Sequence, residues 1–276
     1  MKIPSKNEMC SCYFEDPRQN KVKRKILNAH LEYFYFSNAI NIKCDGDEVI
    51  NICLLKGASF LTRDNEKLDV NQFDMVFIPN NEHIKITPKS NNKLNNKICI
   101  VKSKIIENND IEYKPEFEIK HFSLDNFQPR GEFGDSDKMA TYREVWTAFK
   151  NGFYMSGFTN IPNNALSQGV VTSVNLEKED GKVKIYPHIH PEYPEVYIYC
   201  IDDDSQSIAV SQYLINAKGN SVVKDLNDGD GVFFNGSMGH INFAKPTYKN
   251  LEYCLYMWII PTFGKKKDIK PVTLHI

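Results

Sequence analysis

The sequence has no long hydrophobic run, which excludes several classes of protein. No apolar stretch reaches the length of a membrane span, and residues 1–8 contain no apolar segment of the kind that a secretory signal requires. Acidic and basic residues nearly balance, with a formal net charge of −1 at pH 7, so the composition favours neither nucleic acid nor a membrane as a partner. We therefore expect a cytoplasmic protein that acts on a small soluble molecule.

Paired cysteines are also missing. The chain has seven cysteines, an odd number, and no Cys-x-x-Cys pair of the type that builds structural zinc sites. Apart from Cys10 and Cys12 they stand singly, for example in the apolar segments around Cys53 and Cys99. We expect buried free thiols without a chemical role.

β-Forming sequence is abundant instead. Short segments rich in β-branched and aromatic residues alternate with Asp, Asn and Gly turns over about residues 33–106 and again over about residues 145–260. Residues 107–138 lack apolar periodicity, which predicts a segment that connects the two halves along the surface. The sequence therefore predicts an all-β protein with few helices, made of two tandem antiparallel β-barrel or jelly-roll domains, residues 1–115 and 116–276.

A group of metal-ligand residues lies in the second half. In an extended strand alternate side chains share a face, so His188 and His190 are predicted to converge on one point. Pro191 and Pro194 cannot continue a regular ladder and should bend the chain, which can carry Glu195 back toward the histidines. Two imidazoles and a carboxylate suit a borderline divalent metal, and such a set usually takes a further ligand.

His240 is the candidate for that ligand. It follows an apolar strand and a turn of Gly, Asn and Ser, and it begins the next apolar strand. A lone histidine is more often an ordinary polar residue of a barrel wall, and His83 in the first half, which has no ligand-type neighbours, is interpreted in that way. The four residues in the second half follow the order of a cupin, which favours one metal ion there and a metal-free first domain.

The similarity extends beyond the four ligands. It is carried by the segments His188-Ile189-His190, Glu195-Val196-Tyr197-Ile198-Tyr199, Asp202-Asp203-Asp204, Ser237-Met238-Gly239-His240 and Met257-Trp258. In these segments the chain resembles 5-dehydro-4-deoxy-D-glucuronate isomerase, also called 4-deoxy-L-threo-5-hexosulose-uronate ketol-isomerase, a bicupin family of pectin degradation. The resemblance implies a zinc ion held by His188, His190, Glu195 and His240, with Mn²⁺ or Fe²⁺ as other suitable ions, a sugar acid as substrate, and a homo-oligomer, a hexamer in that family.

An aldose–ketose isomerase needs more than its metal. The reaction passes through an enediol, and a carboxylate on the substrate calls for a cation to orient it. Arg143 is the first candidate for that cation. Lys184, which shares the metal-facing parity of its strand, is the second, and it is also a candidate catalytic residue that handles the proton. Tyr197 and Tyr199 share the parity of Glu195, so their hydroxyls are predicted to point into the barrel, either as proton donors or as ordinary core aromatics.

Three alternative functions stay open at this point. The related bicupin 5-deoxy-glucuronate isomerase of inositol breakdown acts on a similar sugar acid. The same ligand set also suits iron or manganese in a dioxygenase. A non-catalytic cupin that binds a sugar acid is the third alternative.

Overall fold

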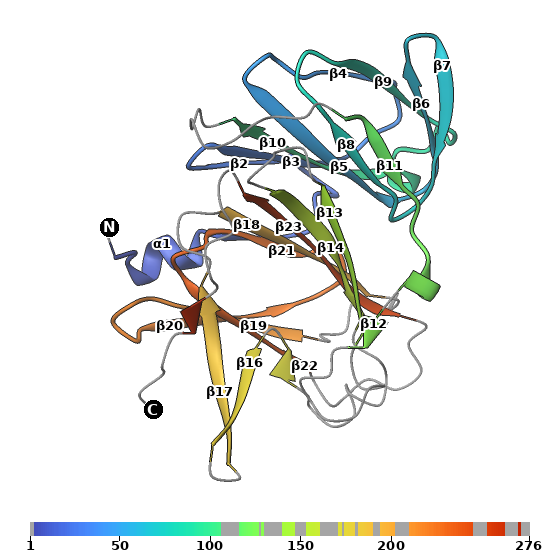
Figure 1. Cartoon of the computed structure of the whole chain (residues 1–276). Coiled ribbons are helices and arrows are strands. Elements are labelled where there is room, and N and C mark those ends of the chain that lie inside the picture. The colour runs from blue at the N-terminus through green and yellow to red at the C-terminus, as the bar shows by residue number, and fades with distance from the viewer. Residues whose placement is uncertain are drawn as a thin grey trace.

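The structure, a computed structural model, describes most of the chain. The described residues are 3–105, 116–126, 128–129, 140–146, 153–160, 171–172, 174–179, 182–189, 194–201, 210–244, 253–262 and 270–271. The described strands form four sheets in which every pairing is antiparallel, and these sheets stack as successive layers (Figure 1). The all-β fold class that the sequence predicts is therefore confirmed.

Two of the sheets belong to the first half of the chain. The outer N-terminal sheet has the order β4 (Ile40–Lys43), β9 (His83–Pro88), β6 (Ser59–Arg63), β7 (Glu66–Val70). The inner N-terminal sheet has the order β11 (Glu118–Lys120), β8 (Met75–Ile78), β5 (Glu48–Lys56), β10 (Lys97–Lys104), β3 (Ala29–Tyr35), β2 (Val22–Ile26). The short 3₁₀ helix η1 (Lys93–Asn95) precedes β10.

The other two sheets belong mainly to the second half. The inner C-terminal sheet has the order β1 (Tyr13–Phe14), β21 (Gly231–Asn235), β18 (Pro194–Ile201), β23 (Cys254–Thr262), β14 (Phe153–Asn160), β13 (Ala140–Trp146), β12 (Gln128–Pro129). The outer C-terminal sheet has the order β16 (Val174–Glu179), β17 (Lys182–Ile189), β22 (Gly239–Ala244), β19 (Val210–Ile215), β20 (Ser221–Leu226), with β15 (Val171–Thr172) paired to β22 and β24 (Lys270–Pro271) paired to β17.

The burial of the strands explains their sequence patterns. On β9, at the outer surface of the first half, Ile84 and Ile86 are buried while His83 and Lys85 are exposed. This is the period-two alternation of a sheet with one wet face. On β5 the segment from Val49 to Leu55, apolar except for Asn51, is buried throughout, because the strand is covered on both faces.

The two halves share a core. On β5, Ile50, Ile52 and Leu54 pack inside the first barrel, whereas the alternate residues Val49 and Cys53 pack toward the second half. The residues that meet them come from the inner C-terminal sheet, among them Phe158, Val196, Ile198, Phe233, Leu255, Met257 and Ile259. The two inner sheets thus pack face to face and form the domain junction.

The N-terminus of the chain joins the second half. Helix α1 (Lys6–Cys10) begins with a capping box, in which Ser5 N donates to Glu8 Oε2 at 2.7 Å and Glu8 N donates to Ser5 Oγ at 3.3 Å. Its buried Met9 packs into the core of the second barrel. Strand β1 then pairs with β21, with Tyr13 opposite Val232. No helix in the described part of the chain is both long and apolar enough to cross a membrane.

The division of the chain at residue 115 can be compared with these pairings. Residue 115 itself lies outside the described residues. Strand β11, which follows it, still pairs with β8 of the first half, and β12 pairs with β13 of the second half. The 3₁₀ helix η2 (Leu124–Asn126) lies between β11 and β12, so the described strands change sheet between Lys120 and Gln128.

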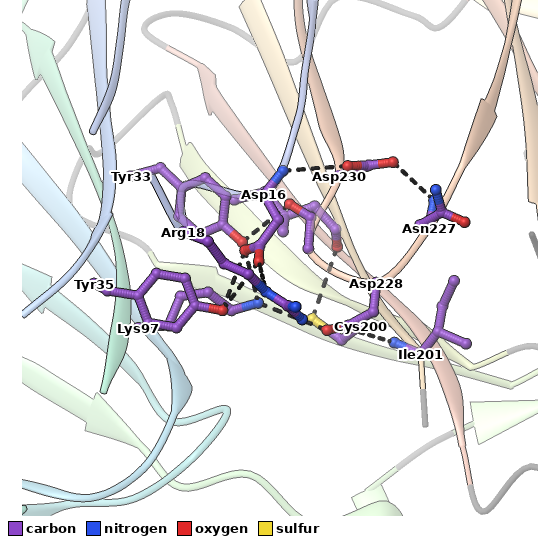
Figure 2. Close-up of polar contacts among 12 residues, drawn as sticks. Asp16, Arg18, Tyr33, Tyr35, Lys97, Cys200, Ile201, Asn227, Asp228 and Asp230 are labelled. Carbon is purple, nitrogen blue, oxygen red and sulfur yellow. Dashed lines mark hydrogen bonds and ion pairs between the residues drawn. The ribbon is translucent and has the colours of Figure 1, made fainter. Parts of the chain in front are cut away.

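A network of polar contacts centred on Asp16 ties the two halves together (Figure 2). The Tyr35 hydroxyl donates to Asp16 Oδ2 at 3.1 Å, and Lys97 Nζ lies 3.3 Å from Asp16 Oδ1. From the second half, Asp230 Oδ1 accepts from Asp16 N at 3.2 Å, and Asp228 Oδ2 lies 3.8 Å from Lys97 Nζ. Each carboxylate therefore bridges residues far apart in the sequence.

Candidate metal centre

Glu195 and His240 face each other inside the second barrel. Glu195 lies on β18 of the inner C-terminal sheet and His240 on β22 of the outer one. Glu195 Oε2 lies 3.5 Å from His240 Nε2, and the side chains are 2% and 0% exposed. The structure therefore brings together two of the four predicted metal ligands from opposite walls of the barrel.

The other two predicted ligands can be placed only in part. In the pairing of β17 with β22, His188 stands directly opposite His240. The side chain of His188 and the whole of His190 lie outside the described residues. Among the described residues no group of three or more His, Cys, Asp or Glu side chains could hold a metal ion, so the described part of the predicted set is the pair Glu195 and His240.

Strand β18 separates the metal side from the junction side by simple alternation. Tyr197 and Tyr199 belong to the core of the second barrel, whereas Val196, Ile198 and Cys200 belong to the junction core. The predicted orientation of both tyrosines toward the barrel interior is confirmed. β18 can thus present polar groups on one face while its other face holds the two halves together.

The two tyrosines differ in what they contact. The Tyr197 hydroxyl lies 2.9 Å from His240 Nε2, whereas the Tyr199 hydroxyl donates to Asn242 Oδ1 at 2.7 Å. His240 Nδ1 lies 3.5 Å from the Met238 carbonyl oxygen. Tyr197 therefore contacts a candidate metal ligand through its hydroxyl, and Tyr199 does not.

The surroundings of the pair are apolar and aromatic. The ring centroid of Phe234 lies 4.9 Å from that of His240 and 5.8 Å from that of Tyr197. Tyr256 packs against the other side of Tyr197, with a centroid distance of 5.2 Å. Such packing fixes the rings and keeps the local dielectric low, which strengthens every charge interaction at the site.

The electrostatics of Glu195 fit a bound cation. Burial raises the pKa of the Glu195 carboxyl to about 8, and the hydrogen bond from Tyr197 lowers this pKa only in part. Burial also raises the pKa of Tyr197 well above its usual value, with the Glu195 charge adding to the effect, so the phenol stays a donor. A carboxylate and an imidazole in van der Waals reach are a suitable donor set for zinc, manganese or iron, and a divalent ion beside them would favour the ionised carboxylate.

The predicted cationic residues lie on strands of the two different C-terminal sheets. Arg143 stands on β13 opposite Gly157, and Lys184 stands on β17 opposite Glu177. The side chains of both residues lie outside the described part of the chain. Lys184 thus shares its strand with His188, and Arg143 shares the inner C-terminal sheet with Glu195.

Sequence reasoning missed the facing polar residues Gln212 and Asn242 of the second barrel. Gln212 on β19 stands opposite Asn242 of β22 and is 0% exposed. The sequence pattern could have indicated Gln212, because Val210, Gln212 and Leu214 share one face of the strand. A polar residue between two apolar core positions is unusual.

The first barrel has a different interior. Its core is filled by aliphatic side chains such as Ile50, Ile84 and Ile100, and His83 is exposed on the outer sheet. The interiors of the two barrels therefore differ. The described interior of the second barrel contains polar side chains, whereas the first is packed with aliphatic ones.

A polar cavity of about 1040 Å³ lies elsewhere, at the edge of the domain junction. Its lining includes Asp16, Tyr35, Lys97, Asp228 and Asp230. These are residues of the Asp16 network. From β18 the lining includes Cys200, which lies on the junction face of the strand. Glu195 and Tyr197, which point into the second barrel, do not line this cavity. The cavity is thus separate from the candidate metal centre.

Comparison with known proteins supports the fold. No protein-family model matches the chain, and no curated protein matches it in sequence. Several solved structures are similar at 10–12% sequence identity. An IolB-like protein from Salmonella typhimurium LT2 has a TM-score of 0.55 at 10% identity, over 98% of this chain and 91% of that one. A glyoxylate-induced protein from Pseudomonas aeruginosa has a TM-score of 0.53 at 11% identity, over 92% and 88%.

A third similar structure is a known metalloenzyme. Bacillus subtilis oxalate decarboxylase, described with Mn(II) centres, has a TM-score of 0.50 at 12% identity, over 95% of this chain and 79% of that one. Identities this low show the fold alone. The chain is thus a protein of the cupin fold, all-β and antiparallel, and the chemistry of its second barrel must be argued from its own residues.

Proposed function

We propose that the protein is a metal-dependent aldose–ketose isomerase of a sugar acid, of the kind that converts 5-dehydro-4-deoxy-D-glucuronate to 3-deoxy-D-glycero-2,5-hexodiulosonate. The observation that carries this proposal is the convergence of Glu195, His240 and the Tyr197 hydroxyl in one buried site, with His188 opposite His240 in the sheet. The pair Glu195 and His240 supports the predicted ligand set.

In this proposal His188, His190, Glu195 and His240 hold one divalent ion, zinc first and manganese or iron next. When bound, such an ion supplies a fixed positive charge beside the oxyanion of an enediol. The Tyr197 hydroxyl, held within 2.9 Å of His240 Nε2, stands where it can donate to a substrate oxygen. The aromatic wall of Phe234 and Tyr256 keeps water from this donor.

The other predicted residues have supporting roles in this proposal. Arg143, or Lys184 in its place, orients the substrate carboxylate, and Tyr199 supports the Tyr197 side of the barrel through Asn242. In this proposal the protein is cytoplasmic, and the resemblance implies a homo-oligomer, a hexamer. Light scattering that finds a monomer at every concentration would contradict the assembly without affecting the site.

The proposal is tested with the metal-loaded protein and 5-dehydro-4-deoxy-D-glucuronate. We expect conversion to the 2,5-diketo product without uptake of oxygen, together with about one equivalent of metal per chain. Turnover of 5-deoxy-glucuronate instead would support the related isomerase of inositol breakdown. Oxygen consumption would support a dioxygenase, and binding without turnover would support a non-catalytic sugar-acid-binding cupin.

A further inference from the structure

The side chain of Gln212 is buried, and no described residue forms a hydrogen bond with its amide. It is 0% exposed, and neither Nε2 nor Oε1 has a partner among the described residues. The Tyr13 hydroxyl donates to the backbone carbonyl of Gln212 at 3.0 Å, which leaves the amide group of the side chain unaffected. Buried amides in folded proteins are nearly always paired, so this one requires an explanation.

The amide of Gln212 lies in the same barrel as the candidate metal centre. Val210 and Leu214, the alternate residues on β19, belong to the core cluster that contains Tyr197 and Tyr199. Gln212 shares their face of the strand. Leu214 stands opposite His240 in the pairing of β19 with β22, so Gln212 is two residues along β19 from the cross-strand partner of a candidate metal ligand.

The neighbouring amide provides a contrast. Asn242, the cross-strand partner of Gln212, is equally buried, but its Oδ1 accepts a hydrogen bond from Tyr199 at 2.7 Å. The described residues of the barrel therefore supply a donor to the amide of Asn242 and no partner to the amide of Gln212. A primary amide offers N–H donors beside a carbonyl acceptor, and a sugar hydroxyl can accept from the first and donate to the second.

We propose that Gln212 binds hydroxyl groups of the ligand in the second barrel and thereby selects a polyhydroxylated acid over a plain carboxylic acid. This inference rests on the proposed function for the location of the ligand. It adds the residue that distinguishes a sugar acid from an acid of similar length without hydroxyls. Selection of this kind is strong, because a ligand that lacks the hydroxyl leaves the buried amide unpaired.

The first test measures the protein without ligand. Gln212→Met keeps the length of the side chain and removes both unpaired polar atoms. We expect the midpoint of thermal unfolding to rise by about 2–6 °C, because a buried group without partners destabilises the folded state. Tyr199→Phe, which removes the donor to Asn242, should lower the midpoint. If Gln212→Met lowers it as well, the amide is a structural element and the inference is wrong.

The second test measures binding by calorimetry on metal-loaded protein, with D-glucuronate and adipate as probes. Both have six carbons, but only D-glucuronate carries hydroxyls. We expect Gln212→Met to weaken D-glucuronate at least tenfold and adipate less than twofold, and Gln212→Leu to behave in the same way. Equal weakening of both probes, or no binding of D-glucuronate to the wild type, would overturn the inference. Gln212-dependent binding of D-glucuronate in a protein that lacks isomerase turnover would support the inference and contradict the proposed function.

Discussion

The Tyr197 hydroxyl and His240 Nε2 lie 2.9 Å apart, and this contact places a proton donor against a candidate metal ligand beside the ring of Phe234. Replacement of Tyr197 by Phe keeps the ring and removes that donor. We expect kcat on the uronate substrate to fall by roughly ten- to a thousand-fold with little change in KM, the pattern of an interaction made chiefly in the transition state.

Tyr199→Phe is the matched control for this prediction. It removes an equally buried hydroxyl of the same strand whose acceptor, Asn242, is not a candidate metal ligand. We expect the free energy of unfolding to fall by about 1 kcal/mol and turnover per folded molecule to persist. Steady-state kinetics and chemical denaturation of both variants test this prediction. An unchanged kcat in Tyr197→Phe would contradict a catalytic role for the Tyr197 hydroxyl.

The metal content should depend on the histidines of the second barrel. We expect about one equivalent of zinc in the wild type and a loss of most of it in His240→Ala and in the double variant His188→Ala/His190→Ala. His83→Ala changes an exposed histidine of the first half and is the control. Elemental analysis with circular dichroism on the same samples tests this, and equal metal content in all variants would contradict the assignment.

The fold should survive these substitutions. The core of each half is extensive and the two inner sheets share a further apolar core, so folding does not depend on an ion as it does in a zinc finger. Cooperative unfolding of the metal-free variants is therefore the expected result.

Lys97 should make a large contribution to stability. Its side chain is 4% exposed, and it lies between Asp16 and Asp228 with the rings of Tyr33 and Tyr35 within 6 Å. Removal of one partner from a buried ion pair typically costs about 3 kcal/mol or more. We expect Lys97→Met to lose about this much, and Lys104→Met, in an exposed pair with Asp47, to change the denaturation midpoint little.

The pH dependence of Lys97 gives a separate check. Burial lowers the pKa of the Lys97 ammonium, but Asp228 and Asp16, with smaller contributions from Tyr35 and Cys200, more than reverse this, so the pKa is raised above its usual value. A raised pKa stabilises the folded state fully below the unfolded pKa of about 10.4, and this stabilisation is lost as the pH rises through the folded pKa. The stability difference between wild type and Lys97→Met should therefore be constant from pH 7 to about 9.5 and shrink above about 10.4. A constant difference up to pH 12 would contradict this reading.

Some of these features could be predicted from the sequence and others could not. The period-two pattern of β18 correctly placed Glu195, Tyr197 and Tyr199 on one face, because strand geometry is local. The sequence analysis predicted no helix at residues 6–10, although Ser5 and Glu8 form a capping-box pattern. The pairing of β1 with β21 and the Asp16–Lys97 contact join residues more than eighty positions apart, and no local pattern encodes such partners.

The cysteines should differ sharply in reactivity. All seven are free, and only Cys10 is exposed. Burial raises the pKa of the Cys12, Cys44 and Cys254 thiols to about 12, which keeps them protonated and unreactive at pH 8. We expect one thiol per native chain and seven per denatured chain to react with Ellman's reagent, and none beyond the background in native Cys10→Ser. Rapid reaction of a second native thiol would contradict the closed packing of the two barrels.

The last prediction concerns the tight approach of two segments at the junction. Gly229 has φ +82°, and a Cβ built on it would lie 2.5 Å from Asp16 Oδ1, whereas Gly219 has φ +79° and open space around it. Gly219→Ala should therefore cost only the backbone penalty of about 1 kcal/mol. Gly229→Ala must in addition displace Asp16, which lies 3.3 Å from Lys97 and accepts from Tyr35, so we expect a loss of about 3 kcal/mol in the free energy of unfolding. Equal losses in the two variants, measured by urea denaturation, would show that the Asp16 network yields without cost and does not hold the two halves together.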